Sequence, residues 1–371
     1  MKRLYKTMIT AFSVLCLQGL LFAQNMSNLL LQNGYVLVLA CGMLLCILTG
    51  GNIDLSVGSV ICLTGGLAAV LITNLGWNPY LTIVICVLVG IAVGVWQGYW
   101  IGYVRIPPFI TTLAGMFVFR GIGRLVLDSK TVPIKEPAFT DLFTSYINIP
   151  GLDVISTKAN PVENPHIWSP LVSGAIVVVV ILVMTIRNRI NRAKHGYTQK
   201  SPLVDYGKVV VIGALIMWYC SLLTQYKGIS VMLVWVLAIC MIYYFITSKT
   251  SFGRYFYAVG GNEKATRLSG INTNKVYFLA YANMGLLAGL CGLLCLARVG
   301  SVSGATGTSF EMDAIASCFI GGVVIGAMLL GVLNMGMSIM GITDSWQYVV
   351  KGGVLLVAVI FDVVSSRKSG K

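Results

Sequence analysis

The stretch YVLVLACGMLLCILTGGNIDLSVGS, residues 35–59, runs from an uncharged apolar segment into a polar break marked by glycines. An α-helix crosses the hydrocarbon core of a membrane with about 20 mostly apolar residues. Comparable runs without charged residues recur along the chain, at 81–95, 172–185 and 209–223. Because these runs are continuous and do not alternate, they predict transmembrane helices and argue against a transmembrane β-barrel.

The composition supports the same fold class. Hydrophobic residues make up 57% of the 371 residues and charged residues 10%, whereas a soluble domain carries about a quarter charged residues. The mean hydropathy is +0.85. The formal net charge of +14 is concentrated in a few loops and at the termini, which is the pattern of cytoplasmic loops. Contact with the anionic lipid bilayer accounts for this charge, so no nucleic-acid partner is expected.

We predict a single all-α transmembrane domain over residues 1–371, a polytopic helical bundle of about 10–12 spans with broken or re-entrant helices. The first apolar run follows Lys2, Arg3 and Lys6, and we interpret it as a retained span because no A-x-A-like cleavage site follows it. The candidate spans are 8–23, 33–50, 55–74, 80–104, 109–127, 169–186, 208–226, 230–247, 275–297, 313–340 and 347–363.

The loops predict the orientation. Segments 187–208 and 248–275 are strongly basic and read as cytoplasmic, whereas 128–168 holds five acids and three lysines and reads as an external loop. Counting spans then places the N-terminus inside. The basic C-terminal SSRKSGK also prefers the cytoplasm, which requires two crossings within 313–340. That stretch spans about 42 Å as one helix, so either it forms two broken half-helices or the sequence lacks a piece.

The segment YAVGGNEKATRLSGI, residues 257–271, predicts a short surface helix. Gly260 and Gly261 favour a turn, and Asn262 is a good N-cap. Glu263 and Arg267 lie where the helix dipole favours an anion and a cation, and Gly270 suits the C′ position. A helix of about two turns is marginal alone, so a partner must hold it. An ordinary basic loop is the alternative interpretation.

The polar break at 50–59 leaves four residues between two predicted spans, too few for an aqueous loop. We therefore expect a broken helix or re-entrant turn buried against protein. Asp54 and Ser56 are expected to cap the following helix, with Asp54 accepting its free N–H groups. Direct contact of Asp54 with a ligand is the less favoured alternative.

Other polar candidates are open to two readings. Arg120 and Arg124 lie one turn apart, and we expect them to snorkel to the interface rather than to bind substrate. Glu311 and Asp313 either cap a helix N-terminus or line a polar path through the membrane. All ten cysteines lie in apolar runs, so packing is expected and neither a metal site nor a disulfide framework. The chain contains no G-x-x-x-x-G-K-[ST] motif and hence no visible nucleotide site.

Taken together, several stretches resemble one family, the permease subunits of bacterial ABC importers for monosaccharides such as ribose, xylose and galactose. The extra pair of spans at 169–186 and 208–226 is similar to the insertion in the xylose and multiple-monosaccharide types. The matching stretches are SNLLLQN (27–33), GGNIDLSVGS (50–59), PPFITTLAGMFVFRG (107–121), FGRYFYAVGGNEKATRLSGIN (252–272), FEMDAIASCFIGG (310–322), GVLNMGMSIMG (331–341) and WQYVVKGGVLLVAVIFD (346–362).

The resemblance implies a transport subunit of the bacterial plasma membrane, with both termini in the cytoplasm and no cofactor of its own. A cytoplasmic ATPase would hydrolyse ATP, an extracellular binding protein would deliver a xylose-like pentose or a hexose, and a second permease copy would complete the path. The coupling helix that docks on the ATPase would comprise Gly260, Gly261, Asn262, Glu263, Arg267, Leu268 and Gly270. Candidate residues of the translocation path or its gate are Asp54, Ser56, Ser59, Thr112, Glu311 and Asp313.

The chain departs from the family pattern at FIGG, residues 319–322, where Val323 follows directly instead of a segment rich in serine and glycine. This is also where the charge count fails, so we expect a deletion there. The first span also looks shorter than in the family.

Two other functions remain open. An ion-coupled secondary sugar transporter would use buried acids paired with bases, and Asp54 has no evident partner in the sequence. A membrane enzyme would need a catalytic constellation, for which two loop histidines, His166 and His195, are weak evidence. Which monosaccharide is carried cannot be read from the sequence.

Overall fold

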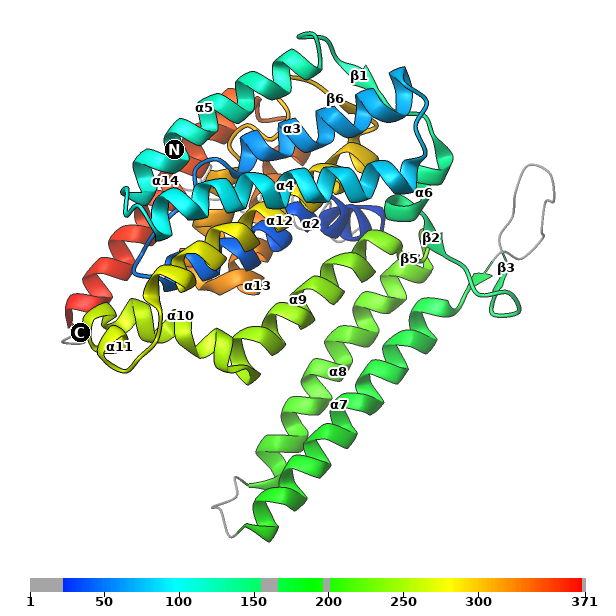
Figure 1. Cartoon of the computed structure of the whole chain (residues 1–371). Coiled ribbons are helices and arrows are strands. Elements are labelled where there is room, and N and C mark those ends of the chain that lie inside the picture. The colour runs from blue at the N-terminus through cyan, green and yellow to red at the C-terminus, as the bar shows by residue number, and fades with distance from the viewer. Residues whose placement is uncertain (1–22, 155–165, 196–200, 369–371) are drawn as a thin grey trace, which may run out of the picture. The chain divides into compact units, whose positions relative to one another are not determined.

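The computed structural model describes residues 23–154, 166–195 and 201–368, which are almost entirely helical (Figure 1). Within these ranges, nine helices are long and apolar enough to cross a membrane, which confirms a polytopic helical bundle. The predicted span 8–23 lies outside the described residues except for Ala23. The predicted span 347–363 forms a helix but is not among the nine.

The long helices are α2 (Ala23–Leu48), α3 (Val57–Ala69, continued by the π-helical turn η1, Val70–Asn74), α4 (Pro79–Gly102), α5 (Pro108–Val126), α7 (Ser169–Lys194), α8 (Pro202–Thr224), α9 (Val231–Lys249), α12 (Thr273–Val299), α13 (Phe310–Ile339) and α14 (Asp344–Lys368). The short elements are α6 (Pro137–Thr144), α10 (Ser251–Gly261), α11 (Glu263–Leu268), β1 (Val132–Pro133), β2 (Tyr146–Ile147), β3 (Asp153–Val154), β4 (His166–Ile167), β5 (Ile229–Ser230) and β6 (Ser301–Val302).

The chain divides into two compact units. One comprises Met1–Leu29 and Tyr146–Val231, and the other Leu30–Ser145 and Met232–Lys371. The segment predicted as a continuous external loop, 128–168, holds α6 and four two-residue strands, which pair as β1–β6, β2–β5 and β3–β4.

The first unit is built on the antiparallel pair α7 and α8 (Figure 1). Gly174 lets the two helices approach closely, since a Cβ there would lie 2.6 Å from Cys220 Sγ. The predicted basic loop 187–208 is wrong in its boundaries, because α7 continues to Lys194 and α8 begins at Pro202. An ion pair of 2.8 Å between Arg189 and Asp205 joins the two helix ends.

The second unit has α12 at its centre, packed against α4 and α3. A stripe of glycines four residues apart on α4 faces the α12 backbone. A Cβ at Gly90, Gly94 or Gly98 would lie 2.5–2.6 Å from a backbone carbonyl oxygen of α12. Because only glycine fits, the two backbones touch, as in membrane helix pairs that associate through small residues.

Helix α13 turns back on itself at Gly322. Gly322 has φ +77°, a left-handed conformation that interrupts a right-handed helix. A Cβ on Gly326 would collide with the carbonyl oxygen of Ser317, although nine residues of straight helix rise about 13.5 Å. The two halves therefore lie against each other, which is the broken-helix alternative predicted for 313–340.

Candidate functional site

The polar break between α2 and α3 is a buried turn. Gly50 and Gly51 have φ +107° and +80°, and they reverse the chain after α2. Asp54 is 2% exposed and accepts hydrogen bonds from the backbone N–H (2.8 Å) and hydroxyl (2.7 Å) of Ser56. The Ser56 hydroxyl in turn accepts from Gln97 Nε2 on α4 at 2.7 Å. These hydrogen bonds thus connect the turn before α3 to the buried side chain of Gln97 on α4.

The predicted capping role of Asp54 is wrong in detail. The Asp54 carboxylate accepts from the N–H of Ser56, which is the N-cap residue. The N–H groups of Ser59 and Val60 in the first turn of α3 donate to the Ser56 carbonyl. Burial raises the pKa of Asp54 to about 6, against the lowering effect of the Ser56 hydrogen bonds. Asp54 is therefore a desolvated acid at a helix junction.

A second polar cluster surrounds Arg120 of α5. Its guanidinium donates to the Ser59 hydroxyl (3.3 Å), to the Thr306 carbonyl (2.8 Å) and to the Thr308 hydroxyl (3.3 Å). These acceptors hold the Arg120 side chain against the loop before α13. That Arg120 snorkels to the membrane interface stays a prediction. Arg124, by contrast, is exposed.

Glu311 lies in the first turn of α13, beside this cluster. The residue is 9% exposed, and a Cβ on Gly58 would lie 2.5 Å from Glu311 Oε2. Within the described part of the chain, that oxygen has no hydrogen-bond partner. Glu311 therefore lies against Gly58 at the start of α3, next in the chain to Ser59, another of the predicted path residues.

Asp313 forms a buried ion pair that the sequence interpretation missed. Its carboxylate lies 3.1 Å from Lys351 Nζ of α14 and accepts a hydrogen bond of 2.8 Å from Tyr35 OH of α2. Asp313 is 2% exposed and Lys351 18%. The signal was present, because Lys351 is the single basic residue in the apolar run 346–362. An ionisable residue at such a position marks a functional candidate.

The structure brings the six predicted path residues together only in part. Asp54 bonds to Ser56, Ser59 joins Glu311 around Arg120, and Asp313 turns to α2 and α14. Thr112 is fully buried, and its hydroxyl donates to the Phe109 carbonyl of its own helix at 3.4 Å.

The predicted surface helix is α11. Asn262 caps it, with its side-chain oxygen accepting from Ala265 N–H at 3.0 Å, and Gly270 follows it with φ +82°. Glu263 lies in the first turn and Arg267 in the last, as predicted. The predicted turn at Gly260 and Gly261 is wrong, because both residues belong to α10.

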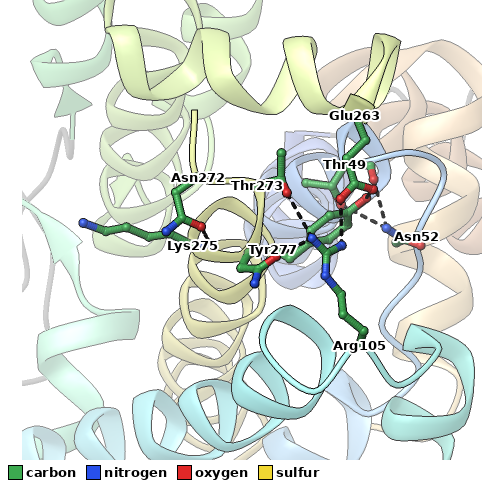
Figure 2. A network of polar contacts seen from close by, with 9 residues as sticks. Thr49, Asn52, Arg105, Glu263, Asn272, Thr273, Lys275 and Tyr277 are labelled. Atoms are coloured by element: carbon green, nitrogen blue, oxygen red, sulfur yellow. Dashed lines mark hydrogen bonds and ion pairs between the residues drawn. The ribbon is translucent and has the colours of Figure 1, made fainter. Parts of the chain in front are cut away.

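Contacts within the chain hold α11 in place (Figure 2). Arg105, in the turn between α4 and α5, pairs with Glu263 at 2.8 Å and donates to Thr273 Oγ1 at 3.0 Å and to Asn274 Oδ1. Tyr277 donates to Glu263 Oε2 at 3.1 Å, and its ring lies 5.0 Å from the Arg105 guanidinium carbon. Burial alone would raise the pKa of Glu263, but the hydrogen bond and charge of Arg105 hold it below its usual value.

Gly260 connects the same segment to the first polar break. A Cβ on Gly260 would collide with the carbonyl oxygen of Leu48, and it would lie 3.3 Å from Gly50 N. The helices α10 and α11 therefore contact two interhelical turns, one through Gly260 and the other through Glu263. The outward side of α11 is exposed, and Leu268 is 90% exposed.

The sequence of the whole chain also matches known proteins. The family model described as branched-chain amino acid transport system / permease component matches residues 25–359. This chain belongs to that permease family. It is therefore a multi-pass membrane protein that acts as a transport component, not as an enzyme.

The chain is 34% identical to the xylose transport system permease protein XylH of Escherichia coli K12, over 94% of this chain and 87% of the relative. It is 34% identical to XylH of Haemophilus influenzae (96% and 93%) and 30% identical to the ribose import permease protein RbsC of E. coli K12 (91% and 85%). No solved structure matches this permease. The family resemblance noted in the sequence is thus confirmed.

Proposed function

We propose that this permease is the membrane-spanning subunit of an ATP-binding-cassette importer that moves a monosaccharide, a xylose-like pentose or a hexose, into a bacterial cell. The substrate class is supported by the printed activities of the relatives, which are xylose and ribose transport. ATP would be bound by a separate cytoplasmic ATPase, and a binding protein outside the membrane would deliver the sugar. A second copy of the chain would complete the path.

The observation that carries this proposal is the position of α10 and α11. They present an exposed surface with Arg267 and Leu268, while their inner side contacts both the α2–α3 turn and the α4–α5 turn. A helix so placed can transmit displacement from a docked ATPase to the core, which is what coupling between two states of a transporter requires. Docking on the ATPase would use Gly260, Gly261, Asn262, Glu263, Arg267, Leu268 and Gly270.

The reversal of α13 at Gly322 supports the proposed cytoplasmic position of the C-terminus, and the loop charges support that of the N-terminus. If the two halves enter and leave the membrane on one side, α14 ends on the side of the basic segment 248–275. The basic residues near the C-terminus then agree with the loop charges.

The test is Arg267→Glu in the complete transporter of permease, ATPase and binding protein. Sugar uptake should fall by at least about tenfold, as expected for a charge reversal that costs a contact about 1.4 kcal/mol or more. Arg192→Glu, an exposed reversal at the end of α7, is the matched control. Equal uptake and equal sugar-stimulated ATP hydrolysis in both variants would reject the assignment of α11.

An ion-coupled sugar transporter is the second candidate, and the Asp313–Lys351 pair is the observation that favours it. A buried acid bonded to a base and a tyrosine is a common feature of proton-coupled transport. Uptake driven by a proton gradient without any ATPase would support this alternative. Uptake abolished by mutating the phosphate-binding lysine of the ATPase would exclude it.

A further inference from the structure

A cavity of about 480 Å³ lies beside α11, between α10 and the first turns of α12. Its lining changes character along α12. Asn272 and Lys275 lie at the surface end of that helix, whereas Val276 and Leu279 lie further along it, facing Phe252 of α10. The cavity is thus polar and basic at one end and apolar at the other, and it opens where the membrane-spanning helix begins.

Lys275 is available to bind an anion. Its side chain points away from the Arg105–Glu263 network (Figure 2), and the residue is exposed. Across the described residues, its ammonium has neither an ion pair nor a hydrogen bond. The single acid in the segment 248–275, Glu263, is already bound by Arg105 and Tyr277.

The surrounding charge has one sign. The segment that borders the cavity also carries Lys249, Arg254, Lys264 and Arg267. Such a basic cluster at the end of a membrane helix attracts anionic lipid headgroups. Tyr255, which lines the cavity and is 39% exposed, has the amphipathic side chain that is enriched at the membrane–water interface.

We propose that this cavity is a binding site for one anionic phospholipid, with the phosphate at Lys275 and Asn272 and an acyl chain along Phe252 and Leu279. A free phosphate would satisfy Lys275 but leave the apolar end in water, whereas a lipid covers both ends. The lipid would also contact Ser269 and Gly270, the residues that end α11. Binding here would steady the turn that follows the surface helix, and it does not require the proposed sugar transport.

The experiment is native mass spectrometry of the purified full-length permease, titrated with phosphatidylglycerol or phosphatidylcholine. Phosphatidylglycerol should bind more tightly, and Lys275→Gln should weaken its tightest binding step about fivefold, the contribution of one lysine near an anionic surface. Lys275→Arg should retain binding. Lys208→Gln removes the same charge from an exposed position on α8 and should leave that step unchanged.

A second variant tests the acyl end of the cavity. Leu279→Trp fills that end and should weaken phosphatidylglycerol binding with Lys275 intact, while thermal unfolding checks that the variant is folded.

Several outcomes would overturn the lipid site. The first is equal phosphatidylglycerol binding by the Lys275→Gln and Lys208→Gln variants, and the second is equally tight binding of phosphatidylcholine. Displacement of the lipid by millimolar inorganic phosphate would indicate a simple anion site. Displacement on adding the ATPase would show that the ATPase, and not lipid, occupies the cavity. Because the readout is lipid binding, failure of the sugar-transport proposal would leave the result interpretable.

Discussion

Two ion pairs in the second unit use the same chemistry in different surroundings. Arg105 and Glu263 are 37% and 36% exposed and join the surface helix α11 to the α4–α5 turn, whereas Asp313 and Lys351 are 2% and 18% exposed and join α13 to α14. Water screens the first pair, so breaking it costs little free energy. Such a pair suits a contact that forms and breaks as the surface helix moves. The second pair is desolvated, so loss of one partner leaves a buried charge.

The largest effect is expected from Lys351→Met, which leaves Asp313 charged and buried beside Tyr35. The free energy of unfolding should fall by about 3–5 kcal/mol, the usual cost of removing one partner of a buried pair. The measurement is the thermal unfolding midpoint of the detergent-purified permease. The double variant Asp313→Asn/Lys351→Met should recover most of the loss, and Lys208→Met controls for the removal of an exposed charge. Equal stability of the single and double variants would contradict this view of the pair.

Asp54 differs from both ion pairs. It is a buried acid that, within the described residues, accepts hydrogen bonds but forms no ion pair. Its pKa is raised from 3.8 to about 6 in the folded protein, so the folded state binds the proton more tightly. Ionisation of Asp54 therefore destabilises the folded state. This loss of stability is absent below about pH 4 and complete above about pH 6, where it reaches about 3 kcal/mol at most.

Asp54→Asn keeps an oxygen for the Ser56 N–H and removes the charge. It should therefore match the wild type in stability at pH 4 and exceed it at pH 7.5, as followed by unfolding midpoints at the two pH values. A difference between the two proteins that does not change with pH would show that Asp54 does not titrate as its burial implies.

The smallest effect on stability is expected from Arg105→Gln. A pair exposed by about a third contributes about 0–1 kcal/mol, so the unfolding midpoint should barely change. Transport should respond more strongly, because the contact between α11 and the α4–α5 turn is lost. A double-mutant cycle with Glu263→Gln, measured on both stability and uptake, separates the two effects. A large loss of stability with normal uptake would show that the Arg105–Glu263 pair stabilises the fold and does not contribute to transport.

The sequence predicted the bundle, the position of α11 and its cap, because these depend on local patterns. Apolar length marks a span, and Asn262 caps the helix that follows it whatever surrounds it. The charge count marked 313–340 as irregular but left two alternatives, a broken helix and a deletion, of which the deletion was expected; the left-handed Gly322 is the irregularity that the structure shows there.

The contacts that the sequence did not reveal join segments far apart in the chain. Arg120 donates to the carbonyl of Thr306, 186 residues further along the chain, and no local pattern reports that contact. Lys351 and Asp313 are 38 residues apart, and each alone is consistent with an interfacial position. The error at Asp54 is local: this carboxylate lies three residues before the first residue of α3 and bonds to the N-cap residue Ser56 instead.

The glycine stripe on α4 has a mechanical consequence. Gly90, Gly94 and Gly98 each meet a carbonyl oxygen of α12 where no Cβ fits. Ile91, Val95 and Tyr99, each one residue further along α4, point about 100° away from these glycines. A rotation of α4 about its own axis that turned these side chains toward α12 would drive them into the α12 backbone. The close contact between the two helices therefore restricts rotation of one against the other.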